Sequence, residues 1–209
     1  MTPIKKIRIL IADDHKLMRM GLVSLFGVQK DMTVIGEAED GEAAVQCAAK
    51  LKPDIVIMDL MMPKMNGADA TSAIIAANPT IGVIILSSYA DSFDMVRAIS
   101  NGARGALAKE SPTENLVAAV REVAAGGTDI APDIMRYVQC NPLPPPLTEK
   151  QMAILASVAR GLSNKDIAVE FGISHISVKK HLSVIFAKLG VATRAEATAL
   201  ALNKHLLKL

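Results

Sequence analysis

Short apolar runs alternate with amphipathic stretches along the first part of the chain. The runs are rich in β-branched residues and occupy residues 7–12 (IRILIA), 32–38 (MTVIGEA), 54–59 (DIVIMD), 81–88 (IGVIILSS) and 105–109 (GALAK). Stretches with the apolar spacing of a helix lie among them, at residues 15–29, 40–51, 67–78, 92–101 and 113–125. Five strands that alternate with helices, several of them apolar on both faces, predict a parallel sheet covered by helices on both sides.

The pattern changes at Leu147, after which every periodic stretch is helical. Four helices are expected, each opened by a Ser or Thr that can cap it: Thr148, Ser163, Ser174 and Thr193. Gly161 and Gly172 are expected to end the first two. The short turn at residues 171–173 joins the second and third helices as in a helix-turn-helix motif, whose second helix enters the major groove of DNA.

The third of these helices has a two-sided pattern. The side chains expected to face the domain core are Ile176, Val184, Ile185 and Leu189. Lys179, Lys180 and Ser183 share a more polar arc. That arc is either a surface for nucleic acid or a solvated charged face.

Charge divides the chain at the same place. Residues 1–146 hold 14 Lys and Arg against 17 Asp and Glu, a net charge of −3, whereas residues 147–209 hold 9 against 4, a net charge of +5. A basic carboxyl-terminal part suits a polyanionic partner. Four of the five residues at 142–146 are proline, which cannot continue a helix. We therefore expect a first domain at residues 1–127, a linker at 128–146 that is Pro-rich at its end, and a second domain at 147–209.

Composition narrows the class of protein. Apolar residues make up 51% of the chain and aromatic residues only 3%, so the core is aliphatic and rich in Met. No apolar run reaches the roughly 18 residues of a membrane helix, and the first apolar stretch meets Asp13 too soon for a signal peptide. Cys47 and Cys140 stand alone, without the spacing of a metal or redox site. A cytoplasmic protein without membrane association is expected.

Polar side chains stand at the ends of four of the five strands. They are Asp13 and Asp14 after the first strand, Asp59 after the third, Ser87 in the fourth and Lys109 at the end of the fifth. The carboxyl ends of parallel strands meet at one edge of the sheet, so these groups should converge. Three crowded carboxylates repel one another unless a cation neutralises them, and oxygen ligands favour Mg²⁺. With Lys109 and Ser87 to bind phosphoryl oxygens, Asp59 could be the nucleophile of a phosphoryl transfer. The alternative is a strand that simply surfaces at a solvated acidic edge.

Taken together, these motifs resemble a known family. The segments "ADDH" (12–15), "MDLMMPKMNG" (58–67), "LSS" (86–88) and "LAKE" (107–110) are similar to the signature of the receiver domain of two-component response regulators, over roughly residues 5–127. The resemblance implies a five-stranded, parallel, doubly wound α/β fold of the flavodoxin-like kind, with Asp59 as the phospho-acceptor. It implies that Mg²⁺ is held by Asp13, Asp14, Asp59 and the backbone carbonyl of Met61, that Ser87 is the switch hydroxyl and that Lys109 pairs with the phosphate.

Three positions bear on how such a receiver would work. Many receivers carry Tyr or Phe where this chain has Ala106, so an aromatic rotamer cannot be its switch. Phosphatases that form an aspartyl phosphate often carry a second Asp where this chain has Met61, which cannot transfer a proton. Met61 and Tyr89 are expected to flank the path of the hydrolytic water. Because neither is a good base, we predict slow loss of the phosphoryl group. The alternative is that both side chains point away from that path and the lifetime is ordinary.

The carboxyl-terminal helices resemble the LuxR-type helix-turn-helix of the NarL/FixJ response regulators, a four-helix all-α domain, over residues 147–208. By this resemblance the recognition helix spans about residues 174–188, and Lys179, Lys180 and Ser183 approach base edges. The residues that would contact phosphates or brace the turn are Asn164, Lys165, Ser174, Ser177 and His181. His181 could equally be a structural histidine. Gln151 stands where the family usually has an acid that can form an ion pair.

The sequence therefore predicts a phosphorylation-dependent transcriptional regulator and not an enzyme with an external substrate. A sensor histidine kinase or a small phosphodonor would phosphorylate Asp59 with Mg²⁺ and so change DNA binding by the second domain. Double-stranded DNA and a second copy of the chain are the other expected partners. The helix at 193–206, with Ala195, Ala199 and Leu202, is either the dimer surface on DNA or packed on its own domain. A constitutive architectural DNA-binding protein is the main alternative, since a phosphorelay intermediate would need no DNA-binding domain.

Overall fold

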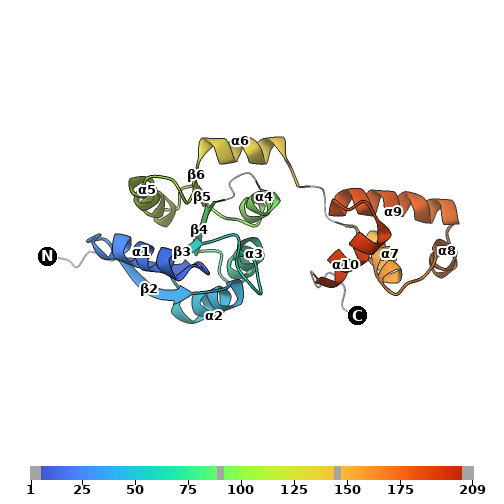
Figure 1. Cartoon of the computed structure of the whole chain (residues 1–209), viewed down its shortest axis with the longest axis horizontal. Helices are drawn as coiled ribbons and strands as arrows, with labels where there is room; N and C mark the ends of the chain where they lie inside the picture. The colour runs from blue at the N-terminus through green and yellow to red at the C-terminus, as the bar shows by residue number, and fades with distance from the viewer. Residues whose placement is uncertain (1–5, 89–91, 144–146, 204–209) are drawn as a thin grey trace. The chain divides into compact units, whose positions relative to one another are not determined.

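A sheet of parallel strands forms the centre of the first of two structural units (Figure 1). The computed structural model describes residues 6–88, 92–143 and 147–203, with side chains described as far as residue 201. The chain divides into a unit that ends at Pro142 and a unit that begins at Leu143. Within the part that the model describes, none of the helices is both long and apolar enough to cross a bilayer.

The sheet of the first unit has the order β2-β1-β3-β4-β5-β6, and every neighbouring pair is parallel. Its strands are β1 (Ile7–Ala12), β2 (Met32–Ala38), β3 (Ile55–Met58), β4 (Gly82–Ser87), β5 (Gly105–Ala108) and β6 (Asp129–Ile130). The five apolar runs read from the sequence are the first five of these strands. The expectation of a parallel α/β sheet is confirmed.

Helices cover both faces of this sheet (Figure 1). They are α1 (Lys16–Gly27), α2 (Gly41–Leu51), α3 (Gly67–Ala77), α4 (Phe93–Ser100) and α5 (Thr113–Ala124). Alternate strand residues serve the two faces: Leu10 and Val56 pack with α2 and α3, whereas Ile9 and Ile55 pack with α1 and α5. Because both faces are buried, the central strand β3 is apolar at every position.

A sixth strand and a further helix lie where the sequence analysis expected a linker. The strand β6 extends the sheet beside β5, and the amide of Ala131 donates to the carbonyl of Ala106 at 3.0 Å. The helix α6 (Pro132–Cys140) then buries Ile134 completely, in the same core cluster as Ala106. The expected five-stranded sheet and the linker at 128–146 are therefore corrected: residues 129–140 belong to the first unit. The prolines at 144–146 lie outside the described residues.

The second unit is entirely helical, as expected. It contains α7 (Glu149–Ala159), α8 (Asn164–Phe171), α9 (His175–Leu189) and α10 (Arg194–Asn203). The hydroxyls of Thr148, Ser163 and Ser174 cap the first three helices by accepting backbone amides. Gly172 ends α8 at a φ of 62°, a left-handed conformation that suits glycine and sets the turn into α9.

One expectation about α9 is wrong. Ile176 and Val184 do not face the core, because their exposed fractions are 57% and 45%. The core side of α9 is instead formed by Val178, Leu182 and Ile185, which are buried together. Apolar spacing was therefore right for Ile185 and Leu189, which lie in or against the core cluster. It was wrong for Ile176 and Val184, since an apolar residue on an amphipathic helix need not be inside.

The last helix packs on its own domain and also leaves a small apolar surface. Ala197 and Ala201 are completely buried in the core of the second unit. Ala195 and Ala199, two of the residues expected to face a second copy, are exposed. The side chain of Leu202, the third, lies outside the described residues.

Candidate functional site

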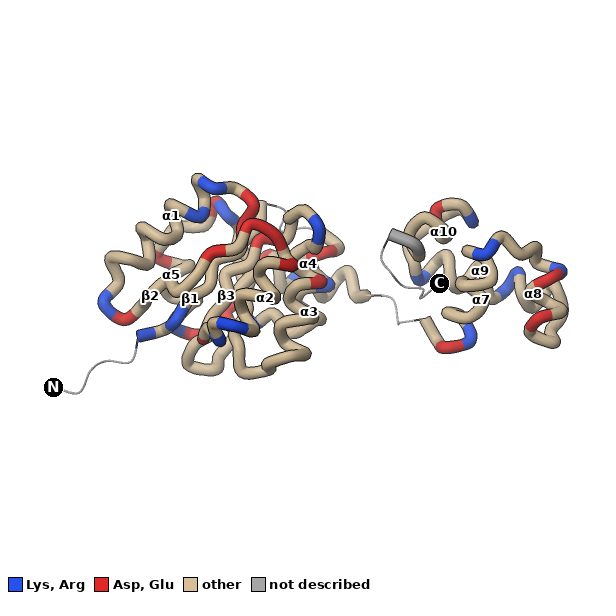
Figure 2. The backbone as a smooth tube through the Cα atoms, turned by 90° about the horizontal axis from the view of Figure 1, so that it is seen from below, with Lys and Arg blue, Asp and Glu red and all other residues tan. Residues whose placement is uncertain are grey.

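Backbone hydrogen bonds that continue the sheet beyond its strands bring the polar strand ends together. The amide of Asp59 donates to the carbonyl of Ala12 at 2.8 Å, which places Asp59 next to Asp13. The amide of Lys109 donates to the carbonyl of Ser87 at 3.0 Å. Stretches of acidic residues meet at this edge of the first unit (Figure 2). The predicted convergence of the strand ends is therefore present.

Lys109 links the two most deeply placed carboxylates. Its ammonium nitrogen lies 2.7 Å from Oδ2 of Asp13 and 2.8 Å from Oδ2 of Asp59. The side chains of both aspartates are almost completely buried, and that of Lys109 is 11% exposed. One cation thus serves two buried acids, which leaves a net negative site in the absence of a second cation.

The second oxygen of Asp59 has a much weaker partner. Among the residues described, Oδ1 accepts only a long hydrogen bond, 3.5 Å, from the amide of Met61. In Asp13, by contrast, Oδ1 accepts the amide of His15 at 2.7 Å, so both of its oxygens are engaged. Of the two buried aspartates, Asp59 is therefore the one that presents a carboxylate oxygen for chemistry.

Close packing by a glycine fixes the loop that follows Asp59. The amide of Gly67 donates to the carbonyl of Leu60 at 2.9 Å. A Cβ at Gly67 would fall 2.0 Å from the backbone oxygen of Asp59, far inside van der Waals contact. Glycine is required at this position because α3 begins against the backbone of Asp59.

Burial and charge act in opposite directions on these groups. Burial raises the pKa of the Asp59 carboxyl above its ordinary value, although Lys109 opposes the shift. Burial lowers the pKa of the Lys109 ammonium, but its bonds to Asp13 and Asp59 outweigh that effect and raise the pKa. At neutral pH Lys109 is therefore positively charged. Ionisation of the buried Asp59 carboxyl, by contrast, destabilises the folded protein.

We predict that Asp59→Asn stabilises the metal-free protein at pH 7. A carboxyl whose pKa is raised on folding contributes stability below its unfolded pKa, and this is lost as the pH rises through the folded pKa. The amide does not titrate, so the stability of the variant relative to the parent should increase as the pH rises from about 4. Urea unfolding in EDTA between pH 4 and pH 7 measures this difference. If the free energy of unfolding of the parent instead rose relative to that of the variant between pH 4 and pH 7, the pKa of Asp59 would not be raised on folding.

The carboxylates also fit a divalent cation. Single ligand atoms of Asp13, Asp14, His15 and Asp59 all lie within 4.8 Å of one another. Asp14 is partly exposed at the open side of this group. Hard oxygen ligands with room for water suit Mg²⁺. The donor set at this edge therefore agrees with the predicted cofactor.

His15 is a member of this cluster that the sequence analysis did not assign. Its Nδ1 lies 2.7 Å from Oδ1 of Asp14 and 3.5 Å from Oδ1 of Asp13. The signal was present in the sequence, since His15 directly follows the two acids at the end of β1. The imidazole therefore lies beside both acids of this segment.

The remaining predicted residues of this edge lie as follows. Ser87 is completely buried at the end of β4. Met61 follows β3 with its side chain 55% exposed. Tyr89 lies outside the described residues, so the expected pair that flanks the hydrolytic water is described only at Met61.

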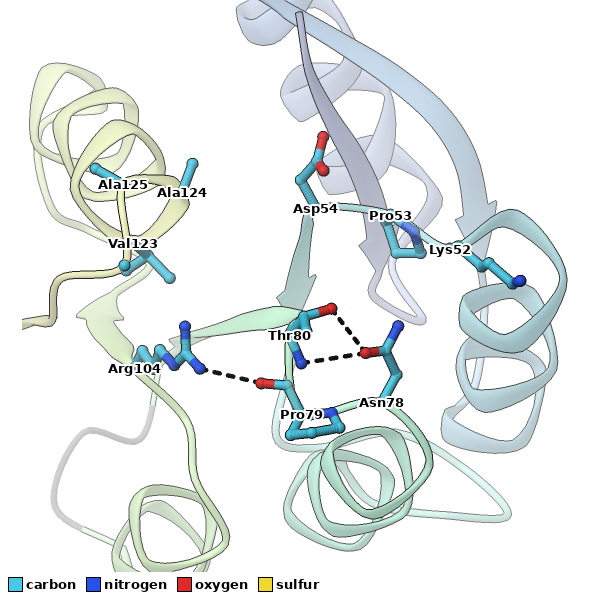
Figure 3. A pocket seen from close by; sticks show the side chains of 11 residues that line it. Lys52, Pro53, Asp54, Asn78, Pro79, Thr80, Arg104, Val123, Ala124 and Ala125 are labelled. Atoms are coloured by element: carbon cyan, nitrogen blue, oxygen red, sulfur yellow. Dashed lines mark hydrogen bonds between the residues drawn. The ribbon is translucent and has the colours of Figure 1, made fainter.

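An open hollow of about 550 Å³ lies elsewhere, at the amino ends of the strands (Figure 3). Its polar groups bond to one another: Arg104 donates to the carbonyl of Pro79 at 3.0 Å, and Thr80 donates to the side chain of Asn78. None of the residues that converge around Asp59 lines it. We assign the chemistry to the carboxyl ends of the strands and none to this hollow.

In the second unit, the predicted DNA-contacting residues fall into two groups. Lys165, Lys179, Lys180 and Ser183 are exposed, whereas His181 is half-buried. Others brace the motif: the amide of Ser177 donates to Oγ of Ser174 at 3.1 Å, and Arg194 donates to Oδ1 of Asn164 at 3.4 Å. The exposed group, which includes both lysines of the predicted base-reading set, is free of such internal roles among the bonds described.

Two side chains join elements of the second unit to one another. Gln151 accepts a hydrogen bond from Lys188 of α9 at 3.0 Å, so the amide keeps a link that an acid would make as an ion pair. Arg194, which the sequence analysis did not single out, donates to the backbone carbonyls of Val158 and Leu162. A lone Arg at the start of a helix carries no sequence signal for that role.

Comparison with known proteins covers both units. Residues 9–121 match the family described as response regulator receiver domain, and residues 145–201 match the family of bacterial regulatory proteins, luxR family. The chain is 37% identical over 208 residues to the transcriptional regulatory protein YdfI of Bacillus subtilis, covering 96% of this chain and 97% of that protein. It is 34% identical over 207 residues to the response regulator protein VraR of Staphylococcus aureus, covering 97% and 99%.

A solved structure is similar over the same extent. The crystal structure of the response regulator ChrA, from a heme-sensing two-component system, matches with a TM-score of 0.56 and 32% identity, covering 97% of this chain and 99% of that one. Both units and their order are therefore shared with this protein.

Proposed function

Because this chain belongs to the response regulators that join a receiver domain to a LuxR-type DNA-binding domain, we propose that phosphorylation of Asp59 controls its binding to DNA. The observation that carries the proposal is the contact of one buried ammonium, that of Lys109, with both Asp13 and Asp59 at the strand ends. A structural ion pair would need one acid. A second buried acid beside the first suits a site that binds a further cation during its reaction.

The proposed reaction is a displacement at phosphorus. An oxygen of the Asp59 carboxylate attacks the phosphorus of a phosphohistidine in a sensor kinase, or of a small acyl phosphate. A P–O bond to Asp59 forms as the bond to the leaving group breaks, and the leaving group keeps the electron pair. Oδ1, whose hydrogen bond is the weaker, supports this role. Lys109 is placed to neutralise the charge on the transferred oxygens.

The residues proposed to hold Mg²⁺ are Asp13, Asp14, Asp59 and the backbone carbonyl of Met61. When bound, the ion supplies positive charge that offsets the carboxylates and the phosphoryl oxygens. The ion would share the carboxylate of Asp14 with His15, whose Nδ1 lies 2.7 Å from Oδ1 of Asp14. Ser87 and Lys109 are the proposed switch residues, joined by the backbone bond between them.

The proposed output is DNA binding by the helix-turn-helix of the second unit, as a homodimer on two half-sites. One short helix reads too few base pairs to be selective alone. Lys179, Lys180 and Ser183 are proposed to meet base edges. The residues proposed to contact phosphates or brace the turn are Asn164, Lys165, Ser174, Ser177 and His181. The exposed Ala195 and Ala199 on α10 support a contact with a second copy.

A cytoplasmic location is part of the same proposal. Cys47 and Cys140 are both free thiols, as expected in a reducing compartment. The slow loss of phosphate predicted from Met61 and Tyr89 also belongs here, supported by the exposed, non-basic side chain of Met61. The chain acts on no external substrate in this account.

We predict that Lys179→Ala and Lys180→Ala each weaken specific DNA binding by about 1–3 kcal/mol if they reach bases, with preference lost at particular positions. Loss of a phosphate contact would instead weaken binding to all sequences alike. It would also make the slope of log K against log salt concentration shallower by about one. Binding titrations at several salt concentrations separate these results. Lys30→Ala, which removes an exposed lysine of the first unit, is the control. Normal binding by both variants would mean that α9 is not the recognition helix.

A further inference from the structure

The outward face of α9 carries apolar side chains between its lysines. After His175, the residues exposed along this helix share one side, because they recur at spacings of three, four and seven: Ile176, Lys179, Lys180, Ser183, Val184 and Ala187. Ile176 is 57% exposed and Val184 is 45% exposed. Lys180 lies between these two, one helical turn from each.

Ile176 and Val184 do not contribute to the packed core of the second unit. Neither Ile176 nor Val184 belongs to the core cluster of the second unit or to the partly buried residues packed against it. Scattered exposed apolar residues are ordinary. Here, however, two large ones flank a lysine on the one helix face that the motif presents to a groove. This arrangement calls for an occupant that offers both apolar groups and negative charge.

Duplex DNA offers that combination in its major groove. Each thymine exposes a 5-methyl group there, and the phosphates line both sides. The net charge of +5 for residues 147–209 favours a polyanion over the apolar surface of a protein partner. Ser174 caps α9, and Ile176 lies in its first turn, from which side chains of a recognition helix reach base edges.

We propose that Ile176 and Val184 are specificity-determining residues that contact thymine methyl groups in the major groove. The two residues are eight positions apart, which is about 12 Å along the helix. This equals about three to four base pairs at about 3.4 Å each. Each half-site should therefore contain two thymine-dependent positions with that separation. The inference rests on the proposed DNA binding and adds the chemical group that is read.

The test removes the methyl groups one at a time. A preferred duplex is first selected from a random library of double-stranded DNA with the full-length phosphorylated protein. Each thymine is then replaced singly by deoxyuridine, which lacks only the 5-methyl group, and affinity is measured by fluorescence anisotropy. Two positions in each half-site should lose about fourfold, the value for one methyl group returned to water.

The protein variants assign each methyl group to its side chain. Ile176→Ala should bind the deoxyuridine and thymidine duplexes equally well at one of the two positions, and Val184→Ala at the other. Both residues are exposed, so folding should be unaffected, and circular dichroism checks this. Val169→Ala is the matched control, since Val169 is 84% exposed on α8 and lies off the α9 face. It should keep the sensitivity at both positions.

Two kinds of result would overturn the inference, and they are distinct. If the protein selects a sequence but deoxyuridine has no effect, or if both variants keep the parent's sensitivity, the proposed function stands and these residues do not read thymine. A normal thymine response with loss of self-association in the variants would likewise assign the face to a protein contact. If no sequence is selected at all, the proposed function fails together with the inference.

Discussion

Asp59→Asn is expected to abolish covalent phosphorylation by acetyl phosphate and Mg²⁺, whereas the parent takes up one phosphoryl group per chain. The carboxamide is not a nucleophile, and among the residues described no other carboxylate shares the contact that Asp59 has with Lys109 except Asp13, whose oxygens are both engaged. Intact-protein mass spectrometry measures the uptake. The effect is all-or-none, because the substitution removes the carboxylate that forms the new bond.

Asp54→Asn is the matched control for this experiment. Asp54 stands at the other end of β3, where its carboxylate accepts the backbone amide of Arg8 at 2.8 Å. The same change of an acid to an amide therefore occurs at both ends of one strand, and only the carboxyl end should matter. Stoichiometric labelling of the Asp59 variant would show that another residue is the acceptor.

Lys109→Met should slow the phosphorylation of Asp59 by about a hundredfold, the usual loss when one group that stabilises transition-state charge is removed. It should also lower the free energy of unfolding in EDTA by about 3–5 kcal/mol, because two buried carboxylates lose their shared cation. Saturating Mg²⁺ should restore more stability to this variant than to the parent, since the ion replaces the missing charge.

The control for Lys109 is Lys30→Met, which removes an exposed lysine of the same unit. It should change neither the rate nor the response to Mg²⁺ beyond about 0.5 kcal/mol. Rapid phosphorylation of Lys109→Met would mean that Lys109 is a structural cation and not part of the chemistry. The lower free energy of unfolding of this variant would then still measure the ion pairs of Lys109 with Asp13 and Asp59.

The strand ends were predictable from the sequence because their signals are local. An apolar run that stops at a carboxylate identifies both a strand and its polar end, as at Ile57 and Asp59. Parallel order then requires that such ends meet, which the sheet confirms. Capping by Ser163 and Ser174 was equally readable, since a cap depends on neighbours within three residues.

The strand β6 and helix α6 were missed for two physical reasons. A strand of two residues, Asp129–Ile130, has no periodicity to detect. The stripe of Ile130, Ile134 and Val138 was available, but it precedes prolines that suggested a linker. Tertiary packing beside Ala106, and not local propensity, decides the fold of this segment.

The exposed face of α9 shows a different limit of sequence reasoning. Hydrophobicity predicted that Ile176 and Val184 would be buried, but the helix has another complete apolar stripe in Val178, Leu182 and Ile185. Only the packed structure shows which stripe faces the core. The stripe left in water is then free to contact a ligand.

The coupling between Asp59 and DNA is the central claim, and one binding measurement tests it most directly. The dissociation constant of the full-length protein for its selected duplex is measured at one salt concentration, before and after treatment with acetyl phosphate and Mg²⁺. The account predicts a change of about fivefold or more in the parent, the lower end of typical coupling between sites, and none in Asp59→Asn. An unchanged constant in parent protein that mass spectrometry shows to be phosphorylated would contradict it.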